Sequence, residues 1–183
     1  MTWLIVLIVI VVVVGLVVLF LYNGLINKRN RVENAWSQID VQLKRRHDLI
    51  PNLVETVKGY AAHERGTLDA VVQARNAAMS ASTPVAAAQA ENQVTGALRQ
   101  LFALSEAYPD LKANQNFLSL QEELSATEGR VAYARQFYND SVLTYNTGIQ
   151  KFPAALIATR MGFKPREYFE ADEDARDTPT VQF

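Results

Sequence analysis

The sequence predicts an all-α protein in which one N-terminal transmembrane helix is followed by a long antiparallel bundle of about four helices. Three observations predict this fold. An uninterrupted apolar stretch occupies residues 4–21. Beyond it, apolar residues recur at alternating steps of three and four, which is the spacing of packed helices and not of strands. The chain of 183 residues also contains only eight glycines and six prolines, so helices are rarely interrupted.

The apolar stretch has the length and composition of a membrane anchor. Seventeen of its eighteen residues are Leu, Ile, Val or Phe, with Gly15 the exception, and no charged side chain precedes Lys28. About 20 apolar helical residues cross the roughly 30 Å hydrocarbon core of a bilayer. Trp3 and Tyr22 flank the stretch, where interfacial aromatic residues belong. A cleaved signal peptide, the alternative, would need a basic start, a shorter apolar run and a small-residue cleavage site.

Basic residues follow the anchor but do not precede it. Lys28, Arg29 and Arg31 come shortly after the apolar stretch. Because positively charged residues favour the cytoplasmic side of a membrane, we expect a single-pass protein with its N-terminus outside and the bundle in the cytoplasm.

The first helix of the bundle is predicted from about residue 25 to residue 62, and a turn is expected at residues 63–66. Pro51 lies inside this helix, where a proline removes a backbone hydrogen bond and usually causes a kink. The row of inward positions at heptad steps is called the seam here. The seam of this helix consists of Val32, Trp36, Ile39, Leu43, Arg46, Ile50, Leu53, Val57 and Tyr60.

Three further helices are predicted from the same periodicity. The second runs from about residue 67 to 82, and the third follows Thr83-Pro84, a pair typical of a helix cap and first helical residue. The third ends by Tyr108, because a residue before proline disfavours helix. Short connections make neighbouring helices antiparallel. The fourth helix, the long partner of the first, carries the inward residues Phe117, Leu120, Leu124, Thr127, Val131, Ala134, Tyr138, Ser141, Tyr145, Gly148 and Phe152.

The chain after Pro153 is predicted to form one more short helix over residues 154–161, which Gly162 ends. The residues that follow are polar and include an acidic run, so we expect partial disorder, mainly beyond about residue 170. The predicted domains are therefore the anchor at 1–24, the helical bundle at 25–163 and a polar tail at 164–183.

One charged residue stands on the seam. The predicted core consists of Trp36, Ile39, Leu43, Arg46, Ile50, Leu53, Phe117, Leu120, Leu124, Val131, Tyr138 and Tyr145. A buried charge is costly unless it is paired, so we expect a partner for Arg46 on the fourth helix. The candidates are Glu128, Tyr138 and Ser141; alternatively, Arg46 extends past the seam to solvent. With such pairing, Arg46→Ala should lower stability, whereas Arg46→Met should keep or raise it.

The neighbours of Arg46 lie off the seam. We expect Lys44, Arg45, His47 and Asp48 at the surface or at a contact with a neighbouring subunit. The stretch KRRHDLIPNL is therefore interpreted as structural and not as catalytic.

The sequence shows no pattern that favours catalysis or cofactor binding. It has no cysteine, which excludes thiolate chemistry. His47 and His63 lack the Glu-x-x-His spacing of metal sites in bundles and would lie about 24 Å apart on one helix. Nucleophile-elbow and phosphate-loop patterns are absent, and a net charge of −1 exerts no pull toward nucleic acid. We therefore expect no catalytic, cofactor-binding or metal residues, no cofactor and no nucleic-acid partner.

Several long segments resemble the LemA family of bacterial membrane proteins. They are the apolar N-terminal helix, RVENAWSQIDVQLKRRHDLIPNLVETVKGYAAHE, YPDLKANQNFLSLQEEL, ATEGRVAYARQFYNDSVLTYNTGIQKFP and GFKPREYFE. The resemblance covers nearly all of residues 1–170. It implies one transmembrane helix and a long helical bundle at the bacterial inner membrane, and it brings no established enzymatic activity or cofactor. Members of the family that the chain resembles are often encoded beside membrane proteins of the protease or envelope-stress type, which suggests a partner without identifying it.

Three functions agree with this organisation. The favoured one is a membrane-anchored, self-assembling scaffold of the bacterial envelope without catalytic activity, because alanine-rich helix faces allow close contact between copies. The second is a lipid- or curvature-binding module, unless the segment concerned folds back and caps the bundle. Its membrane-proximal residues would be Phe152, Leu156, Arg160, Phe163, Lys164 and Arg166. The third is an adaptor for another membrane protein. The expected partners are membrane lipid and further copies of the chain.

Overall fold

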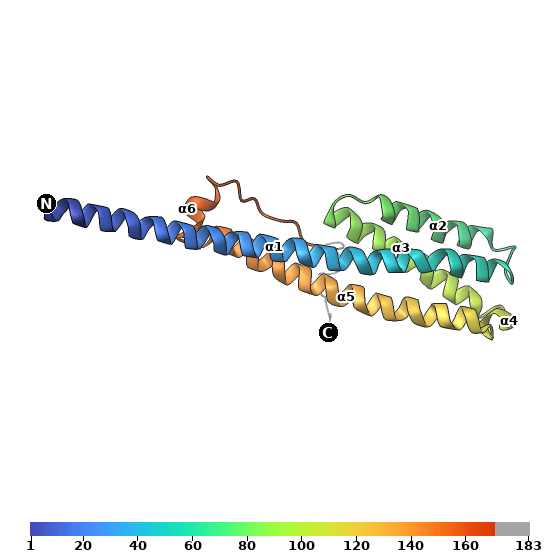
Figure 1. Ribbon diagram of the computed structural model, residues 1–183. Coiled ribbons are helices and arrows are strands. Elements are labelled where there is room, and N and C mark those ends of the chain that lie inside the picture. The colour runs from blue at the N-terminus through green and yellow to red at the C-terminus, as the bar shows by residue number, and fades with distance from the viewer. Residues whose placement is uncertain (171–183) are drawn as a thin grey trace, which may run out of the picture. The chain divides into compact units, whose positions relative to one another are not determined.

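The computed structural model of the protein describes residues 1–170, which contain helices and no strand. The predicted all-α fold class is confirmed. The helices are α1 (Thr2–Lys58), α2 (Arg65–Ser80), α3 (Pro84–Ser105), α4 (Pro109–Lys112), α5 (Gln115–Gln150) and α6 (Ala154–Ala158) (Figure 1). The disorder expected beyond about residue 170 concerns residues outside the described part of the chain.

The described chain forms two compact units. Unit 1 contains Met1–Ile39 and Gln136–Glu167, and unit 2 contains Asp40–Arg135 together with the described residues from Tyr168 onward. Helices α1 and α5 each contribute one part to unit 1 and the other part to unit 2.

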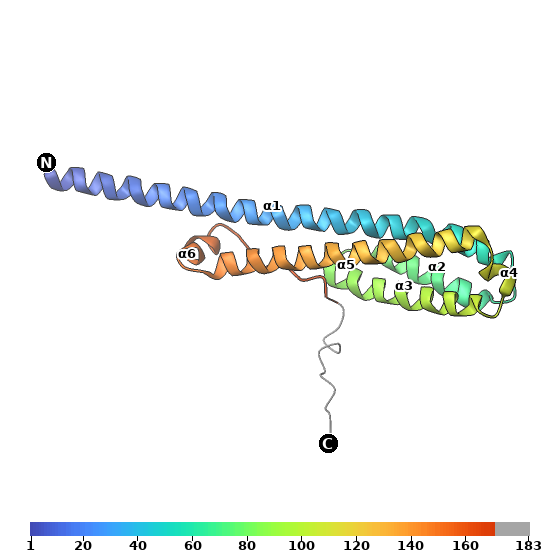
Figure 2. The ribbon, with the colours of Figure 1, turned by 90° about the horizontal axis from the view of Figure 1, so that it is seen from below.

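Unit 2 is a bundle of α2, α3, the second part of α1 and the first part of α5, which lie side by side (Figures 1 and 2). Apolar side chains at steps of three and four face inward from each helix. On α2 these are Leu68, Val71, Ala74 and Ala78, and on α3 they include Val94, Ala97, Leu98 and Leu101. The bundle core continues with Ile50, Leu53 and Val57 of α1 and with Phe117 and Leu124 of α5.

Local chemistry fixes the helix ends in unit 2. The Thr83 hydroxyl accepts a hydrogen bond from the backbone N–H of Ala86 at 3.2 Å, and Pro84 begins α3, so the predicted cap is present. Helix α3 ends at Ser105, before Tyr108, as predicted. Pro109 then begins the short α4.

The apolar part of α1 belongs to unit 1 and is not packed within it. Its most apolar window has a mean hydropathy of 3.8, and none of that window is buried. A core helix of a soluble protein would be covered, whereas a helix that is apolar all round and uncovered suits a bilayer. At 1.5 Å per residue, Leu4–Leu21 extends about 27 Å, close to the thickness of the hydrocarbon core. These properties indicate membrane anchoring.

The remainder of unit 1 pairs the middle of α1 with the second part of α5. Val32, Ala35 and Ile39 of α1 are buried, as are their counterparts on α5. The rings of Trp36 and Tyr138 lie 5.4 Å apart and tilted, which joins the two helices by an aromatic contact. The buried residues of α5 in this unit are Tyr138, Val142, Tyr145 and Ile149.

Most of the predicted core residues are inside the units. Trp36 and Leu120 are partly buried. The buried ones are Ile39, Leu43, Arg46, Ile50, Leu53, Phe117, Leu124, Val131, Tyr138 and Tyr145. Phe152, which the heptad pattern also placed on an inward row, lies beyond the end of α5 and is exposed.

Candidate functional site

Three ionisable side chains are buried together in unit 2. Arg46 and His47 are adjacent on α1, and Glu91 is on α3; their relative exposures are 3%, 7% and 5%. Ala88 and Ala90, which precede Glu91 on α3, are also buried. Ionisable side chains are rarely buried unless they are paired.

The carboxylate of Glu91 joins both α1 residues. Arg46 Nη1 donates to Glu91 Oε2 at 3.0 Å, and Arg46 Nη2 donates to Thr95 Oγ1 at 2.8 Å. His47 Nε2 lies 2.6 Å from Glu91 Oε1. Because Glu91 and Thr95 are four residues apart, they share one face of α3. We call Arg46, His47, Glu91 and Thr95 the polar junction, since they connect α1 to α3 through the interior.

Pro51 extends the junction to α2. Helix α1 continues through Pro51 to Lys58, although proline has no N–H to donate to the carbonyl four residues earlier. That carbonyl belongs to His47. It accepts a hydrogen bond from Arg75 Nε of α2 at 2.7 Å, so the acceptor freed by the proline is satisfied by a neighbouring helix.

The polar junction corrects two sequence expectations. Arg46 is on the seam as predicted, but its partner is Glu91 on α3 and not a residue of the fourth predicted helix. Of the named candidates, Tyr138 and Ser141 belong to unit 1, where their hydroxyls donate to the carbonyls of Glu167 and Phe137. His47, expected at the surface, is buried.

The other charged neighbours are exposed as expected. Arg45 forms an ion pair with Glu123 of α5 at 3.3 Å, with both side chains about half exposed. Such a pair contributes little to stability because solvent screens it.

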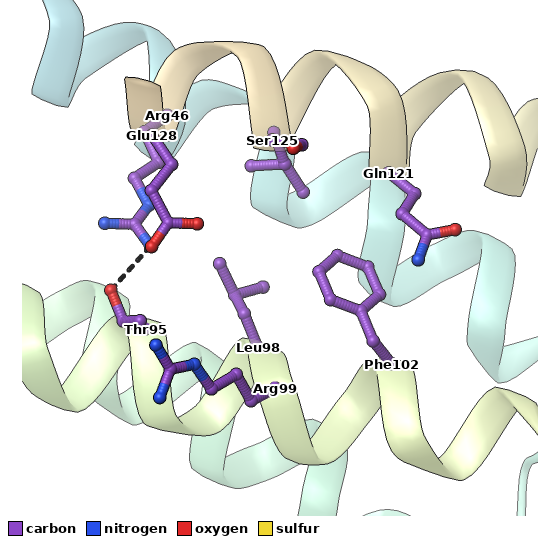
Figure 3. A pocket seen from close by; sticks show the side chains of 9 residues that line it. Arg46, Thr95, Leu98, Arg99, Phe102, Gln121, Ser125 and Glu128 are labelled. Carbon is purple, nitrogen blue, oxygen red and sulfur yellow. Dashed lines mark hydrogen bonds between the residues drawn. The ribbon is translucent and has the colours of Figure 1, made fainter. Parts of the chain in front are cut away.

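A groove opens beside Arg46, between α3 and α5 (Figure 3). Its volume is about 190 Å³. Thr95, Leu98, Arg99 and Phe102 line it from α3, and Gln121, Leu124, Ser125 and Glu128 line it from α5. An adjoining hollow of about 230 Å³ shares Arg46, Thr95, Arg99 and Glu128 with the groove. Arg46 Nε is buried and has no hydrogen-bond partner among the described residues.

The groove suits hydrogen bonding more than bond making. Glu128 is the only carboxylate that lines it, and no histidine does, so a general acid and base pair is not assembled there. Within residues 1–170, no group of three His, Cys, Asp or Glu side chains is arranged to hold a metal ion. The chemistry of the groove is thus that of two guanidinium groups, one carboxylate, an amide and hydroxyls beside an apolar floor.

A second polar cluster holds the segment after α6 against the helices of unit 1. We call residues 163–167 the strap. Its main-chain carbonyls accept hydrogen bonds from Tyr145, Asn146 and Tyr138, at 3.0, 2.9 and 2.9 Å. The N–H of Arg166 donates to Asn146 Oδ1 at 2.9 Å, and its guanidinium pairs with Glu33 of α1. Burial is the largest influence on the pKa of both tyrosines and raises it above 10.0, while the positive charge of Arg166 partly opposes the rise.

The strap divides the residues predicted to be membrane-proximal. Phe163 is buried and contacts Tyr22, with ring centroids 5.8 Å apart, and the guanidinium carbon of Arg29 lies 5.8 Å from the same ring. Arg166 is held at Glu33, eleven residues and about 16 Å further along α1 than Tyr22. Phe152, Leu156, Arg160 and Lys164 are exposed. The expected fold-back thus applies to the strap but not to the residues that precede it.

Sequence reasoning missed Glu91 and Thr95 of the polar junction, Arg75 of α2, which binds the His47 carbonyl, and Asn146 of α5, which binds the strap. One signal was available: Pro51 frees the carbonyl of His47, which calls for an external donor. No such rule identifies Glu91, because an acidic residue between Ala90 and Asn92 resembles any exposed helical position.

Comparison with known proteins gives a consistent result. The model of the LemA family matches residues 35–183. The chain is 28% identical over 158 residues to Protein LemA of Metamycoplasma hominis, which covers 84% of this chain and 71% of that protein. It is 26% identical over 186 residues to the magnetosome protein MamQ of Magnetospirillum gryphiswaldense, covering 87% and 68%. MamQ 2 of Paramagnetospirillum magneticum is 27% identical over the same length and shares.

Proposed function

The chain belongs to the LemA family, and on this premise we propose that it is a membrane-anchored scaffold of the bacterial envelope that assembles with copies of itself and catalyses no reaction. The observation that carries the proposal is a pair of exposed apolar residues on α2, Val72 and Met79, which we call the α2 stripe. Val72 and Met79 are 38% and 57% exposed. They are seven residues apart and therefore lie on one face of the helix.

A groove continues the apolar surface of α2. It has a volume of about 340 Å³, and its lining is half apolar and half charged: Val54, Glu55, Lys58, Ala62, Arg65, Leu68, Asp69 and Val72. Exposed apolar surface that is continuous with a groove is typical of a protein contact. The helix on which it lies is rich in alanine and has only one inward face committed to the core of unit 2, so the adjacent face is free to meet another helix.

Anchoring favours association through such a contact. Copies held in one bilayer share an orientation and diffuse in two dimensions, so a contact that is weak in solution becomes effective. If the α2 stripe meets a different surface of the next copy, the contact is heterologous and builds rings or open patches. With Lys28, Arg29 and Arg31 on the cytoplasmic side, these assemblies would form on the cytoplasmic face of the inner membrane.

The absence of catalysis is supported by how the buried ionisable groups are used. Arg46 and His47 both bind Glu91, and Arg75 binds the main chain. None of these contacts leaves a base beside a nucleophile. The polar groups of unit 2 are therefore interpreted as connections between helices.

Light scattering coupled to size exclusion, on the full chain in mild detergent, tests the proposal. We expect a protein mass above that of one copy, and a lower mass for the variant Val72→Lys/Met79→Lys. The matched control is Val41→Lys, because Val41 of α1 is also an exposed apolar residue of unit 2. A monomer at micromolar protein would refute self-assembly. Equal loss of mass in the control would refute the role of the α2 stripe.

A further inference from the structure

The connection between α5 and the strap lies where the apolar stretch of α1 ends. Tyr22 directly follows this stretch, and the buried ring of Phe163 packs on it with centroids 5.8 Å apart. If Leu4–Leu21 crosses the hydrocarbon core, Tyr22 is at the level of the headgroups. The connection, which leads directly into Phe163 at the start of the strap, is then at this level too.

This connection exposes large apolar side chains. Phe152 and Leu156 are 82% and 64% exposed, and Met161 is also exposed. The short α6 between them buries Ala154 and Ala158, which are four residues apart and share its inner face. Leu156 therefore points away from the other helices of unit 1. Apolar residues beside a membrane anchor and uncovered by protein are characteristic of a segment that enters the bilayer surface.

The charges around this segment are all positive. Lys151, Arg160 and Lys164 are exposed, and the sequence from 151 to 166 has no acidic residue. On α1 the first acidic residue after the apolar stretch is Glu33, which is paired with Arg166 of the strap. Basic groups at this height attract the phosphates of anionic lipids.

We propose that residues 151–164, which include the first two residues of the strap, form a membrane foot, which inserts Phe152 and Leu156 among the headgroups of an anionic bilayer while its basic residues bind lipid phosphate. The strap leads the chain back along unit 1, where Tyr145, Asn146 and Glu33 hold it. It thereby fixes the foot at the end of the anchor. The inference rests on the membrane anchor alone and is independent of self-assembly.

With the foot, unit 1 has two attachments to the membrane instead of one. The transmembrane helix by itself permits rotation about its axis and a range of tilt. A second contact beside the first, formed by a segment bonded to both α1 and α5, restricts how unit 1 sits on the lipid surface. It also makes that position depend on the charge of the headgroups, because the basic residues contribute only where anionic lipid is present.

Site-directed spin labelling of the full chain tests the foot, and the chain contains no cysteine of its own. Single variants Phe152→Cys and Leu156→Cys would be labelled and reconstituted in nanodiscs of phosphatidylcholine mixed with phosphatidylglycerol. The matched control is Leu143→Cys, since Leu143 of α5 in unit 1 is 56% exposed and lies near the level of the Asn146–Arg166 contact. Labels in the bilayer meet dissolved oxygen, and labels in water meet a nickel chelate.

We expect the labels at 152 and 156 to gain access to oxygen and to lose access to nickel relative to the control. Nickel access equal to that at position 143 would overturn the proposal, provided that circular dichroism shows the variants to be folded. Protection from both reagents, with cross-linking between copies, would assign the surface to a second copy of the chain and would also overturn it.

The anionic preference has its own test. In nanodiscs of phosphatidylcholine alone, the labels should be less deeply inserted than in the mixed lipid. The variant Lys151→Gln/Arg160→Gln/Lys164→Gln should abolish this difference between the two lipids. Equal insertion in both lipids, unchanged by the triple variant, would show that the basic residues do not bind lipid phosphate. None of these readouts depends on the mass of the assembly, so failure of the foot and failure of self-assembly are distinguishable.

Discussion

The polar junction makes Arg46 and Glu91 dependent on each other for stability. Their side chains are 4% and 7% exposed, so each charge has little water to stabilise it. Replacing Arg46 by Met keeps the length of the side chain and its aliphatic part, but it leaves the Glu91 carboxylate with His47 alone. Replacing Glu91 by Gln keeps the size but removes the negative charge with which the Arg46 guanidinium is paired. Each single variant therefore strands a buried charge.

The cost of each single variant is set by the stranded charge. Breaking a buried pair by removing one partner costs about 3–5 kcal/mol, so each single variant should lose about 3 kcal/mol or more. The double variant Arg46→Met/Glu91→Gln strands no charge and retains a hydrogen-bond partner for His47. It should lose no more than either single variant alone. Because the partner of Arg46 is Glu91, Arg46→Met by itself should destabilise, unlike the expectation from the sequence.

Urea unfolding of the full chain in detergent, followed by far-ultraviolet circular dichroism, measures these losses. The control is Arg45→Met, which removes the half-exposed pair with Glu123 and should cost less than about 1 kcal/mol because solvent screens that pair. If the loss in the double variant equals the sum of the single losses, the two charges do not interact, and the reasoning is refuted.

Three further predictions follow from the contacts of single residues. Replacing Tyr138 and Tyr145 by Phe should cost about 1 kcal/mol each at neutral pH and should flatten the alkaline fall in thermal stability. The reason is that folding raises the pKa of each tyrosine above 10.0. The resulting contribution to stability is fully present below pH 10 and is lost as the pH rises through the folded-state pKa; an unchanged alkaline profile would contradict this. Arg75→Ala should cost about 1–3 kcal/mol in urea unfolding, and less in a Pro51→Ala background, where the helix supplies its own donor; equal costs would argue against the carbonyl contact. Thr83→Ala should cost about 1 kcal/mol by the same measurement, and no change would mean that the cap does not contribute.

The helices and their inward faces were predictable because they depend on local chemistry. Thr83-Pro84 and the residue before Pro109 act on their own turn of the chain. The heptad steps identify which side of each helix is apolar, and Arg46 was correctly placed on that side. Such information is one-dimensional, since it comes from spacing within a helix.

The partners across the core were not predictable from spacing. The seam of a two-helix contact is narrow, but in unit 2 the second part of α1 meets α2, α3 and α5, so a wider arc of it is buried. His47, one position from Arg46, falls within this wider arc. In the same geometry a carboxylate partner for Arg46 could come from α3 or from α5, and periodicity does not distinguish Glu91 from Glu128.

The hydrogen-bond partners of the strap were missed for a different reason. An extended segment that is held by Asn146 and by tyrosine hydroxyls has no apolar period, so it resembles a polar tail in sequence. Its stability comes from side chains about 20 residues earlier in the chain, and single-sequence reasoning has no access to such pairs.

The contact between Arg75 and the carbonyl that Pro51 frees also constrains the order in which the two residues can be exchanged over evolutionary time. If the proline is lost first, the helix recovers an ordinary main-chain bond and the arginine becomes dispensable. If the arginine is lost first, the carbonyl of His47 remains without a hydrogen-bond donor in the interior. Among homologous chains, lineages with the proline but without a donor at the second position should therefore be scarcer than lineages with the donor alone.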